Sequence, residues 1–203
     1  MSATFWNDRF QSDAYVYGTA PNHFVRDQVG RWPAGAAVLE LGAGEGRNAV
    51  FLAEQDLAVT ALDYATEGLR KLDQLADTRG VSVNTVHADV TAWMPNRTWD
   101  GVVSTFLHLP PEDRPKLYQT LQAALKPGGI IVAEWFRPEQ VTGGYDSGGP
   151  PSVDMMVTED ELRAHFPGEG VQLLRSVETS LDEGPHHRGP AAVVRLVWER
   201  SAE

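Results

Sequence analysis

The sequence predicts an α/β fold built around a mostly parallel sheet, and three features carry that prediction. The first is a glycine-rich turn at residues 42–46, which joins a short apolar run to a run with apolar residues at helical spacing. The second is the repetition of this strand-then-helix pattern over residues 57–136. The third is a pair of segments, 171–181 and 191–198, in which apolar residues recur and which read as two closing strands.

Composition limits the classes of partner. The 203 residues suffice for one domain, predicted over 1–203, with a sizeable core. The chain has 17 basic and 28 acidic residues, a net charge of -11, which disfavours DNA or RNA as a partner. It has no cysteine, which excludes disulfides, thiolate catalysis and zinc–thiolate sites. No signal peptide and no membrane-spanning run is recognised. We therefore expect a cytoplasmic protein that acts on a small molecule, as a monomer or homodimer.

The segment before the first strand, residues 1–34 (the N-terminal segment), is rich in aromatic residues. Most of it is expected to be a helical cap packed on the sheet. The exception is Tyr17 to Asn22, Y-G-T-A-P-N, because glycine, proline and asparagine together favour a turn over a helix.

The glycine-rich turn predicts a nucleotide-type binding site. Val38, Leu39 and Leu41 read as the end of a buried strand, and alternate glycines let a ligand approach the main chain closely. The spacing differs from the dinucleotide fingerprint, since the third glycine comes one position early and Arg47 stands where glycine is expected. A carboxylate at Glu40 would repel a phosphate but would suit an ammonium or sulfonium group.

The run Glu40 to Gly46, E-L-G-A-G-E-G, resembles motif I of the class I S-adenosylmethionine (SAM) methyltransferases. The resemblance implies SAM as the cofactor, S-adenosylhomocysteine as the product, and a Rossmann-like seven-stranded sheet in the order 3-2-1-4-5-7-6. The cofactor-binding residues that it implies around this turn are Glu40, Gly42, Ala43, Gly44, Gly46 and Asn48.

The second strand, 57–62, ends in Asp63, which lies 17 positions after Gly46. An acid near this spacing can reach ribose hydroxyls. The alternative is that Asp63 only caps the helix expected over 64–79. Tyr64, which follows directly, is placed to lie on an adenine face.

Residues 81–87 alternate as a third strand, and Asp89 and Val90 follow. In the methyltransferase pattern these two contact the adenine, while the alternative for Asp89 is a cap of the turn at 90–94. The fourth strand, 99–104, continues into Thr105, taken as a cofactor contact, and then F-L-H-L-P. The Asn/Asp-Pro-Pro-aromatic motif of DNA-base methylases is absent here, which again disfavours a nucleic-acid substrate.

The later elements follow the same pattern. We expect a helix over 112–125, a stop at Lys126 to Gly129, and a fifth strand at 130–136. Residues 137–157, rich in glycine and proline (the lid loop), read as a substrate or lid loop. Thr158 to Glu161 is a capping-box start for a helix that ends near Phe166.

The loop expected at 182–190 contains adjacent histidines. Y-G-x-x-P-N after W-N-D-R-F, together with E-G-x-x-H-x-G at Glu183 to Gly189, resembles the tellurite-resistance and thiopurine-type methyltransferases. That resemblance implies that Tyr17, Gly18 and Asn22 line the cofactor site and that His187 lies near the methyl group, with Arg188 beside it. An exposed hairpin tip explains this loop equally well. No third ligand is offered to the histidines, so no metal site is predicted.

The predicted function is methyl transfer from SAM to a small-molecule acceptor, with a soft nucleophile such as a thiol or a chalcogen oxyanion favoured. An amine or hydroxyl acceptor would need a base, for which His187, His108 and Glu134 are the candidates, and Arg188 could hold an anionic substrate. The alternatives are a nicotinamide-dependent oxidoreductase and a SAM-binding protein without catalysis.

Overall fold

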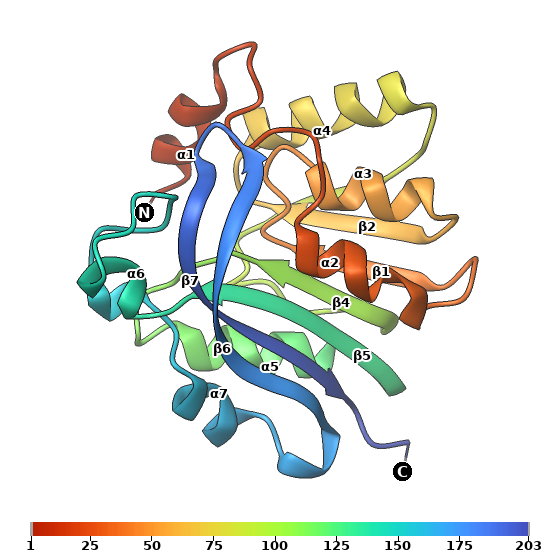
Figure 1. Cartoon of the computed structure of the whole chain (residues 1–203). Helices are drawn as coiled ribbons and strands as arrows, with labels where there is room; N and C mark the ends of the chain where they lie inside the picture. Colours follow the sequence, from red (N-terminus) through yellow and green to blue (C-terminus); the bar gives the residue numbers. More distant parts are fainter. Residues whose placement is uncertain (1, 203) are drawn as a thin grey trace.

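Seven strands form one sheet in the order β3-β2-β1-β4-β5-β7-β6, in a computed structural model that describes residues 2–202 (Figure 1). Only β7 runs antiparallel to its neighbours. The strand bounds are Ala37–Leu41 (β1), Ala58–Asp63 (β2), Asn84–His87 (β3), Trp99–Thr105 (β4), Leu125–Phe136 (β5), Val171–Gly184 (β6) and His187–Glu199 (β7). The predicted fold class and strand order are therefore confirmed. Met1 and Glu203, the ends of the predicted domain, lie outside the described residues.

The α-helices are Ala3–Phe10 (α1), His23–Gln28 (α2), Arg47–Glu54 (α3), Thr66–Arg79 (α4), Arg114–Ala123 (α5), Glu139–Thr142 (α6) and Glu159–His165 (α7). Short 3-10 helices lie at Val29–Arg31, Val153–Met155 and Gly168–Gly170. Helix α7 begins at the predicted cap, where the Thr158 hydroxyl accepts a hydrogen bond from the Glu161 N–H at 3.1 Å. No helix among residues 2–202 has the length and apolar character needed to cross a membrane.

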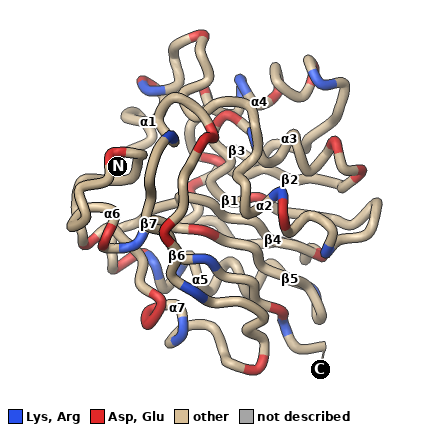
Figure 2. The backbone as a smooth tube through the Cα atoms, viewed as in Figure 1, with Lys and Arg blue, Asp and Glu red and all other residues tan. Residues whose placement is uncertain are grey.

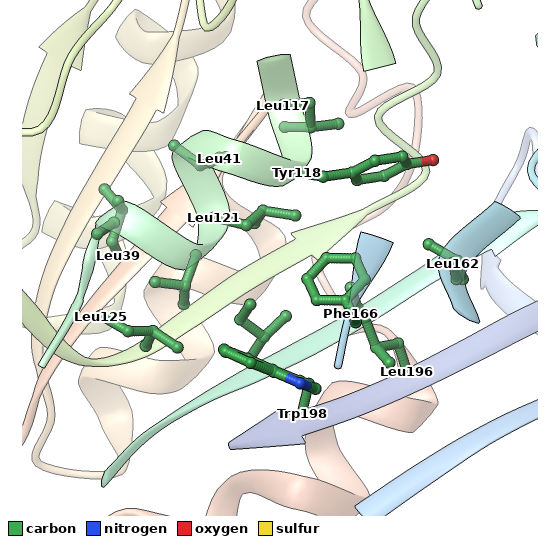
Figure 3. Close-up of a cluster of buried hydrophobic side chains, with 14 of the residues drawn as sticks. Leu39, Leu41, Leu117, Tyr118, Leu121, Leu125, Leu162, Phe166, Leu196 and Trp198 are labelled. Carbon is green, nitrogen blue, oxygen red and sulfur yellow. The ribbon is translucent and has the colours of Figure 1, made fainter. Parts of the chain in front are cut away.

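The two faces of the sheet carry separate hydrophobic cores. On one face, side chains of α2, α3 and α4 pack on β1, β2 and β4, with Val25, Leu52 and Leu72 fully buried. On the other face, α5 and α7 pack on β1, β4, β5 and β7 (Figure 3). Buried apolar side chains contribute about 1.5–3 kcal/mol each, so these two layers fix where the strands end.

The strand register brings the ends of β1 and β2 together. Leu41 pairs with Leu62, and the N–H groups of Gly42 and Ala43 both donate to the Leu62 carbonyl, at 2.9 and 3.0 Å. The glycine-rich turn therefore lies directly beside Asp63, at the carboxyl edge where open α/β sheets bind ligands.

The N-terminal segment divides into two parts. Helix α2 packs on the sheet as expected, through Phe24 and Val25. Helix α1 does not: it lies against α4, and the Asn7 side chain accepts a hydrogen bond from the Glu67 N–H at 2.9 Å. Its apolar residues Trp6 and Phe10 face the glycine-rich turn, not the sheet, which corrects the expectation of a cap on the sheet.

The closing hairpin is longer than predicted. Strand β6 continues to Gly184 and β7 begins at His187, so the expected loop at 182–190 shrinks to a turn at 185–186. The reason is that the hairpin end is covered by the N-terminal segment, beside α1 in Figure 1. A Cβ on Gly184 would lie 2.3 Å from the Tyr17 carbonyl carbon, so glycine permits this close crossing of two backbones.

Two further boundaries differ from the prediction. Residues 126–129 belong to β5 instead of stopping the chain before it, and the pairing of β4 with β5 shifts between Trp99 and Gly101 to accommodate them. Strand β3 is limited to residues 84–87, because only these pair with β2.

Candidate functional site

A cavity of about 440 Å³ lies at the carboxyl edge of β1, β2 and β4. The N-terminal segment, the lid loop and the end of the β6–β7 hairpin complete its wall. Most of the residues predicted from the sequence line it: Tyr17, Gly18, Glu40, Gly42, Ala43, Gly44, Asn48, Asp63, Tyr64, Asp89, Val90, Thr105, His108 and His187.

The three glycines of the turn have different roles. All have positive φ angles, +75° at Gly42, +52° at Gly44 and +86° at Gly46. Gly42 and Gly44 line the cavity, whereas Gly46 faces away from it. A Cβ on Gly46 would lie 2.3 Å from Leu72 Cγ, so this glycine lets α3 pack on α4. Its expected contact with a cofactor is replaced by a packing role.

Glu40 is the most unusual group in the cavity. Its Oε1 accepts a hydrogen bond from Asn48 Nδ2 at 2.9 Å, while its buried Oε2 has no partner among the described residues. Burial raises the pKa of Glu40 from 4.5 to about 8. A buried carboxylate oxygen without a donor is costly, and a cationic ligand group would satisfy it.

Asp63 holds the turn and also faces the cavity. Its two oxygens accept hydrogen bonds from the N–H groups of Ala65 and Gly44, each at 2.8 Å. Burial raises its pKa, against the effect of these backbone donors. The capping role that the sequence allowed is thus present in a related form, just before α4. The Tyr64 N–H also donates to this carboxylate, which leaves about one lone pair for a ligand.

Asp89 caps the turn that follows it, which is the alternative role that the sequence left open. Its Oδ1 accepts hydrogen bonds from the N–H and the hydroxyl of Thr91, at 2.8 and 2.7 Å, which caps the following turn. The residue is exposed at the cavity wall, and Val90 beside it is buried.

Asn22 lies behind the wall and does not line the cavity. Its Nδ2 donates to Glu134 at 2.7 Å and to Glu183 at 3.0 Å, and its backbone N–H donates to Asn48 Oδ1 at 2.8 Å. Asn22 therefore supports the site from outside, contrary to the direct contact that the sequence suggested. Glu134 is fully engaged in the same way, paired with Arg195, so it has no path to a substrate.

His187 is buried and faces the cavity. Arg47 Nη2 lies 3.3 Å from His187 Nδ1, and a guanidinium can only donate, so Nδ1 carries the lone pair and Nε2 carries the proton. Burial, with the charge of Arg47 next, lowers the pKa of His187 from 6.5 to about 2. Arg47 is itself neutralised by Glu183 at 2.9 Å. His187 is thus a neutral hydrogen-bond donor.

His108 has both ring nitrogens occupied. Nδ1 lies 2.9 Å from the Met155 carbonyl, to which it donates, and Nε2 accepts from the Phe136 N–H at 3.2 Å. Burial lowers its pKa to about 4. His108 therefore joins the lid loop to the end of β5, and it offers no free lone pair.

Arg188 does not reach the cavity. Its side chain is 77% exposed and pairs at 3.5 Å with Asp182, which is also exposed. The alternation of a strand explains this, because Arg188 follows the inward-facing His187 in β7.

Several residues of the cavity were not singled out from the sequence as site residues. Phe106 has a φ of +54°, rare for a bulky residue, and its ring stacks on Phe136 with centroids 4.5 Å apart. His187 meets the Phe106 ring edge-on at 4.4 Å. The remaining additions come from α1, from Glu45 and Arg47 at the glycine-rich turn, from the segment after Phe106 and from the lid loop. They include Phe5, Trp6, Arg9, Phe10, Glu45, Arg47, Leu107, Asp146, Gly148 and Pro150.

The sequence contains features that indicate some of these residues. The W-N-D-R-F run carries aromatic residues at helical spacing, and the lid loop was recognised by its glycines and prolines. Among residues 2–202, no group of three or more metal-ligating side chains is placed to hold a metal ion.

Comparisons with known proteins agree with this geometry. Residues 38–129 match the family described as "Methyltransferase domain". The probable S-adenosyl-L-methionine-dependent methyltransferase TehB of Haemophilus influenzae (strain 10810) is 30% identical over 100 residues, 47% of this chain and 35% of TehB. The match thus spans about a third of that relative's length.

Solved structures show the same fold. TehB from Haemophilus influenzae superposes with a TM-score of 0.71 at 18% identity, over 98% of this chain and 67% of TehB. A protein of echinomycin biosynthesis, from a study of the conversion of a disulfide bond into a thioacetal group, gives 0.76 at 17% identity, over 99% and 90%. Residues 38–129 thus match a methyltransferase domain. The strand order and the superpositions show that the whole chain has the fold of the class I SAM-dependent methyltransferases, with TehB among its similar proteins.

Proposed function

We propose that this protein transfers a methyl group from SAM to a small acceptor whose nucleophile is soft and already deprotonated. The observation that carries the proposal is the unpartnered, buried Oε2 of Glu40, which faces the same cavity as the glycine-rich turn and Asp63. An ammonium group would satisfy that oxygen, whereas a dinucleotide would bring a pyrophosphate towards a carboxylate.

The residues fit SAM along the length of the cavity. Glu40 would hold the ammonium of the methionine part, beside the exposed main chain of Gly42 and Gly44. Asp63 would accept hydrogen bonds from the ribose hydroxyls, and Tyr64, Asp89 and Val90 would surround the adenine. Bound SAM supplies an activated methyl group on a sulfonium, so the protein has mainly to align the nucleophile and exclude water.

Neither of the two buried histidines of the cavity offers a base on the acceptor side. His187 presents Nε2–H, and both nitrogens of His108 are occupied by backbone groups. A nucleophile that still carried its proton would have no acceptor there, whereas a thiolate or a chalcogen oxyanion would receive a hydrogen bond from His187. In this transfer the S–CH₃ bond of bound SAM would break as the bond to the nucleophile forms, and its electron pair would stay with the sulfur.

One of the similar structures supports a soft nucleophile. The echinomycin-biosynthesis protein comes from the conversion of a disulfide into a thioacetal, a reaction at sulfur. Acidic positions outnumber basic ones and lie along the whole chain (Figure 2), which favours a small molecule over a polyanion as the substrate. A cytoplasmic, monomeric or homodimeric protein is part of the same proposal.

Two experiments test the proposal. Calorimetric titration with SAM, S-adenosylhomocysteine and NADH should show binding of the first two only; failure of both to bind would overturn it and reopen the oxidoreductase alternative. Incubation with methyl-labelled SAM and a panel of thiols, tellurite, phenols and amines should transfer label to the thiols or tellurite. Binding without transfer to any of them would favour a SAM-binding protein without catalysis.

A further inference from the structure

Arg9 lies in the cavity wall on the last turn of α1. Its guanidinium lies over three aromatic rings, 5.5 Å from the centroid of Tyr17, 5.8 Å from Trp6 and 5.9 Å from Phe5. These contacts hold the side chain against the inner surface of the N-terminal segment, although the residue is only half-buried.

The charge of Arg9 is not neutralised by the protein. No ion pair joins it to a carboxylate in the part of the chain that the structure describes, and its buried Nε has no hydrogen-bond partner there. The other cations near the cavity are paired, Arg47 with Glu183 and Lys71 with Glu45. A buried N–H left without an acceptor is costly unless a ligand satisfies it.

Arg9 lies on the acceptor side of the cavity. The Tyr17 ring that it contacts is also 4.7 Å from the ring of His187, so the two groups are no more than about 10 Å apart. The Arg9 charge is one of those that lower the pKa of His187.

We propose that Arg9 binds a carboxylate of the acceptor, separate from the nucleophile that His187 holds. This inference rests on the proposed methyl transfer and names its substrate class: a small soft nucleophile that also carries an acid group. A guanidinium matches a carboxylate in shape and charge, and the free Nε–H of Arg9 lies along the edge used in two-point pairing. The carboxylate of SAM lies on the same carbon as its ammonium, which places it near Glu40 and Arg47 instead.

The test compares 3-mercaptopropionate with its methyl ester, which lacks the negative charge and is larger by one methyl group. Wild-type protein should methylate the acid with a kcat/KM at least about tenfold above the ester, as expected for a hydrogen bond between charged groups. Arg9→Met should remove that preference by lowering kcat/KM for the acid alone, and Arg9→Lys should keep part of the preference. Arg163→Met, an exposed change on α7, is the matched control. Equal activity on both probes in the wild type, or an equal loss on both in Arg9→Met, would overturn the inference.

A binding measurement separates this inference from the proposed function. Protein saturated with S-adenosylhomocysteine is titrated with the acid and with the ester. Preferential binding of the acid that Arg9→Met abolishes supports the carboxylate site even if neither thiol is methylated. A loss of S-adenosylhomocysteine affinity in Arg9→Met would place Arg9 on the cofactor and overturn the inference, while the methyltransferase proposal would stand.

Discussion

The two halves of the cavity are built in different ways. The half proposed to bind the cofactor (Glu40, the glycine-rich turn, Asp63 and Asp89) comes from consecutive strand ends, held by hydrogen bonds between near neighbours such as Gly44 and Asp63. The acceptor half (Arg9, Tyr17, Phe106, His187 and the lid loop) is assembled from segments far apart, and Arg47 lies 136 residues from Glu183. On this proposal, cofactor binding is local in sequence, whereas acceptor choice depends on the tertiary structure.

We expect the largest effect from breaking the ion pair between Arg47 and Glu183, which joins distant segments of the chain. Glu183→Gln leaves Arg47 buried without its carboxylate and weakens the contacts of Asn22. We expect a loss of about 3 kcal/mol in the free energy of unfolding, measured in urea, as for other broken buried pairs. Asp182→Asn, in the exposed pair with Arg188, is the control and should change stability little. Equal stability of both variants would contradict the structural role of the buried pair.

Asp63→Ala tests the cofactor half alone. The change removes acceptors for two ribose hydroxyls and the support of the Gly44 N–H. We expect SAM affinity to fall about 100-fold, which corresponds to about 2.7 kcal/mol, in calorimetric titration. Unchanged affinity for SAM would show that Asp63 does not bind the ribose and only caps the chain before α4.

Glu40→Gln tests the charge of the cofactor half. Its effects on stability and on SAM binding should depend on pH. Between pH 4.5 and 8 the unfolded chain loses the Glu40 proton while the ligand-free folded protein keeps it, so this group lowers stability as pH rises. Glu40→Gln should therefore raise the Tm of the ligand-free protein at pH 8. The same change should weaken SAM binding about 30-fold at pH 8, since the cation loses its carboxylate.

The affinity of the wild-type protein for SAM should also rise between pH 6 and 8, because binding requires the Glu40 carboxylate. Glu40→Gln should flatten that dependence, as measured by titration at each pH. A wild-type affinity that is flat over this range would contradict a protonated Glu40 in the free protein.

His187→Asn tests the acceptor half, and its expected effect is the smallest of these changes. Turnover should fall about tenfold, the value of one hydrogen bond to an anion, while SAM affinity stays unchanged. The pH–rate profile of the wild type should follow the pKa of the acceptor thiol, because the pKa of His187 is held near 2. A rate limb near pH 6–7 that His187→Asn removes would show instead that His187 acts as a base.

These two halves also explain what the sequence could predict. The fold class, the strand order and the placement of Glu40, Gly44 and Asp63 follow from short motifs, because spacing along one strand–turn–helix unit fixes their geometry. The pairing of Arg47 with Glu183 could not be predicted, since nothing local to either residue indicates its partner. The hairpin ends were misplaced for the same reason: Asp182 to Pro190 has the composition of a loop, yet the N-terminal segment covers it and lets the strands continue.

The crossing of Gly18 and Gly184 has a consequence for the order of folding. A Cβ on Gly18 would lie 2.5 Å from the Glu183 carbonyl oxygen, so the first and last parts of the chain meet backbone to backbone at the cavity. During synthesis from the N-terminus, the glycine-rich turn and Asp63 leave the ribosome long before the hairpin does. A nascent chain can thus form the cofactor pocket early, but the chamber for the acceptor closes only with the final strands, when methyl donor and nucleophile can first meet.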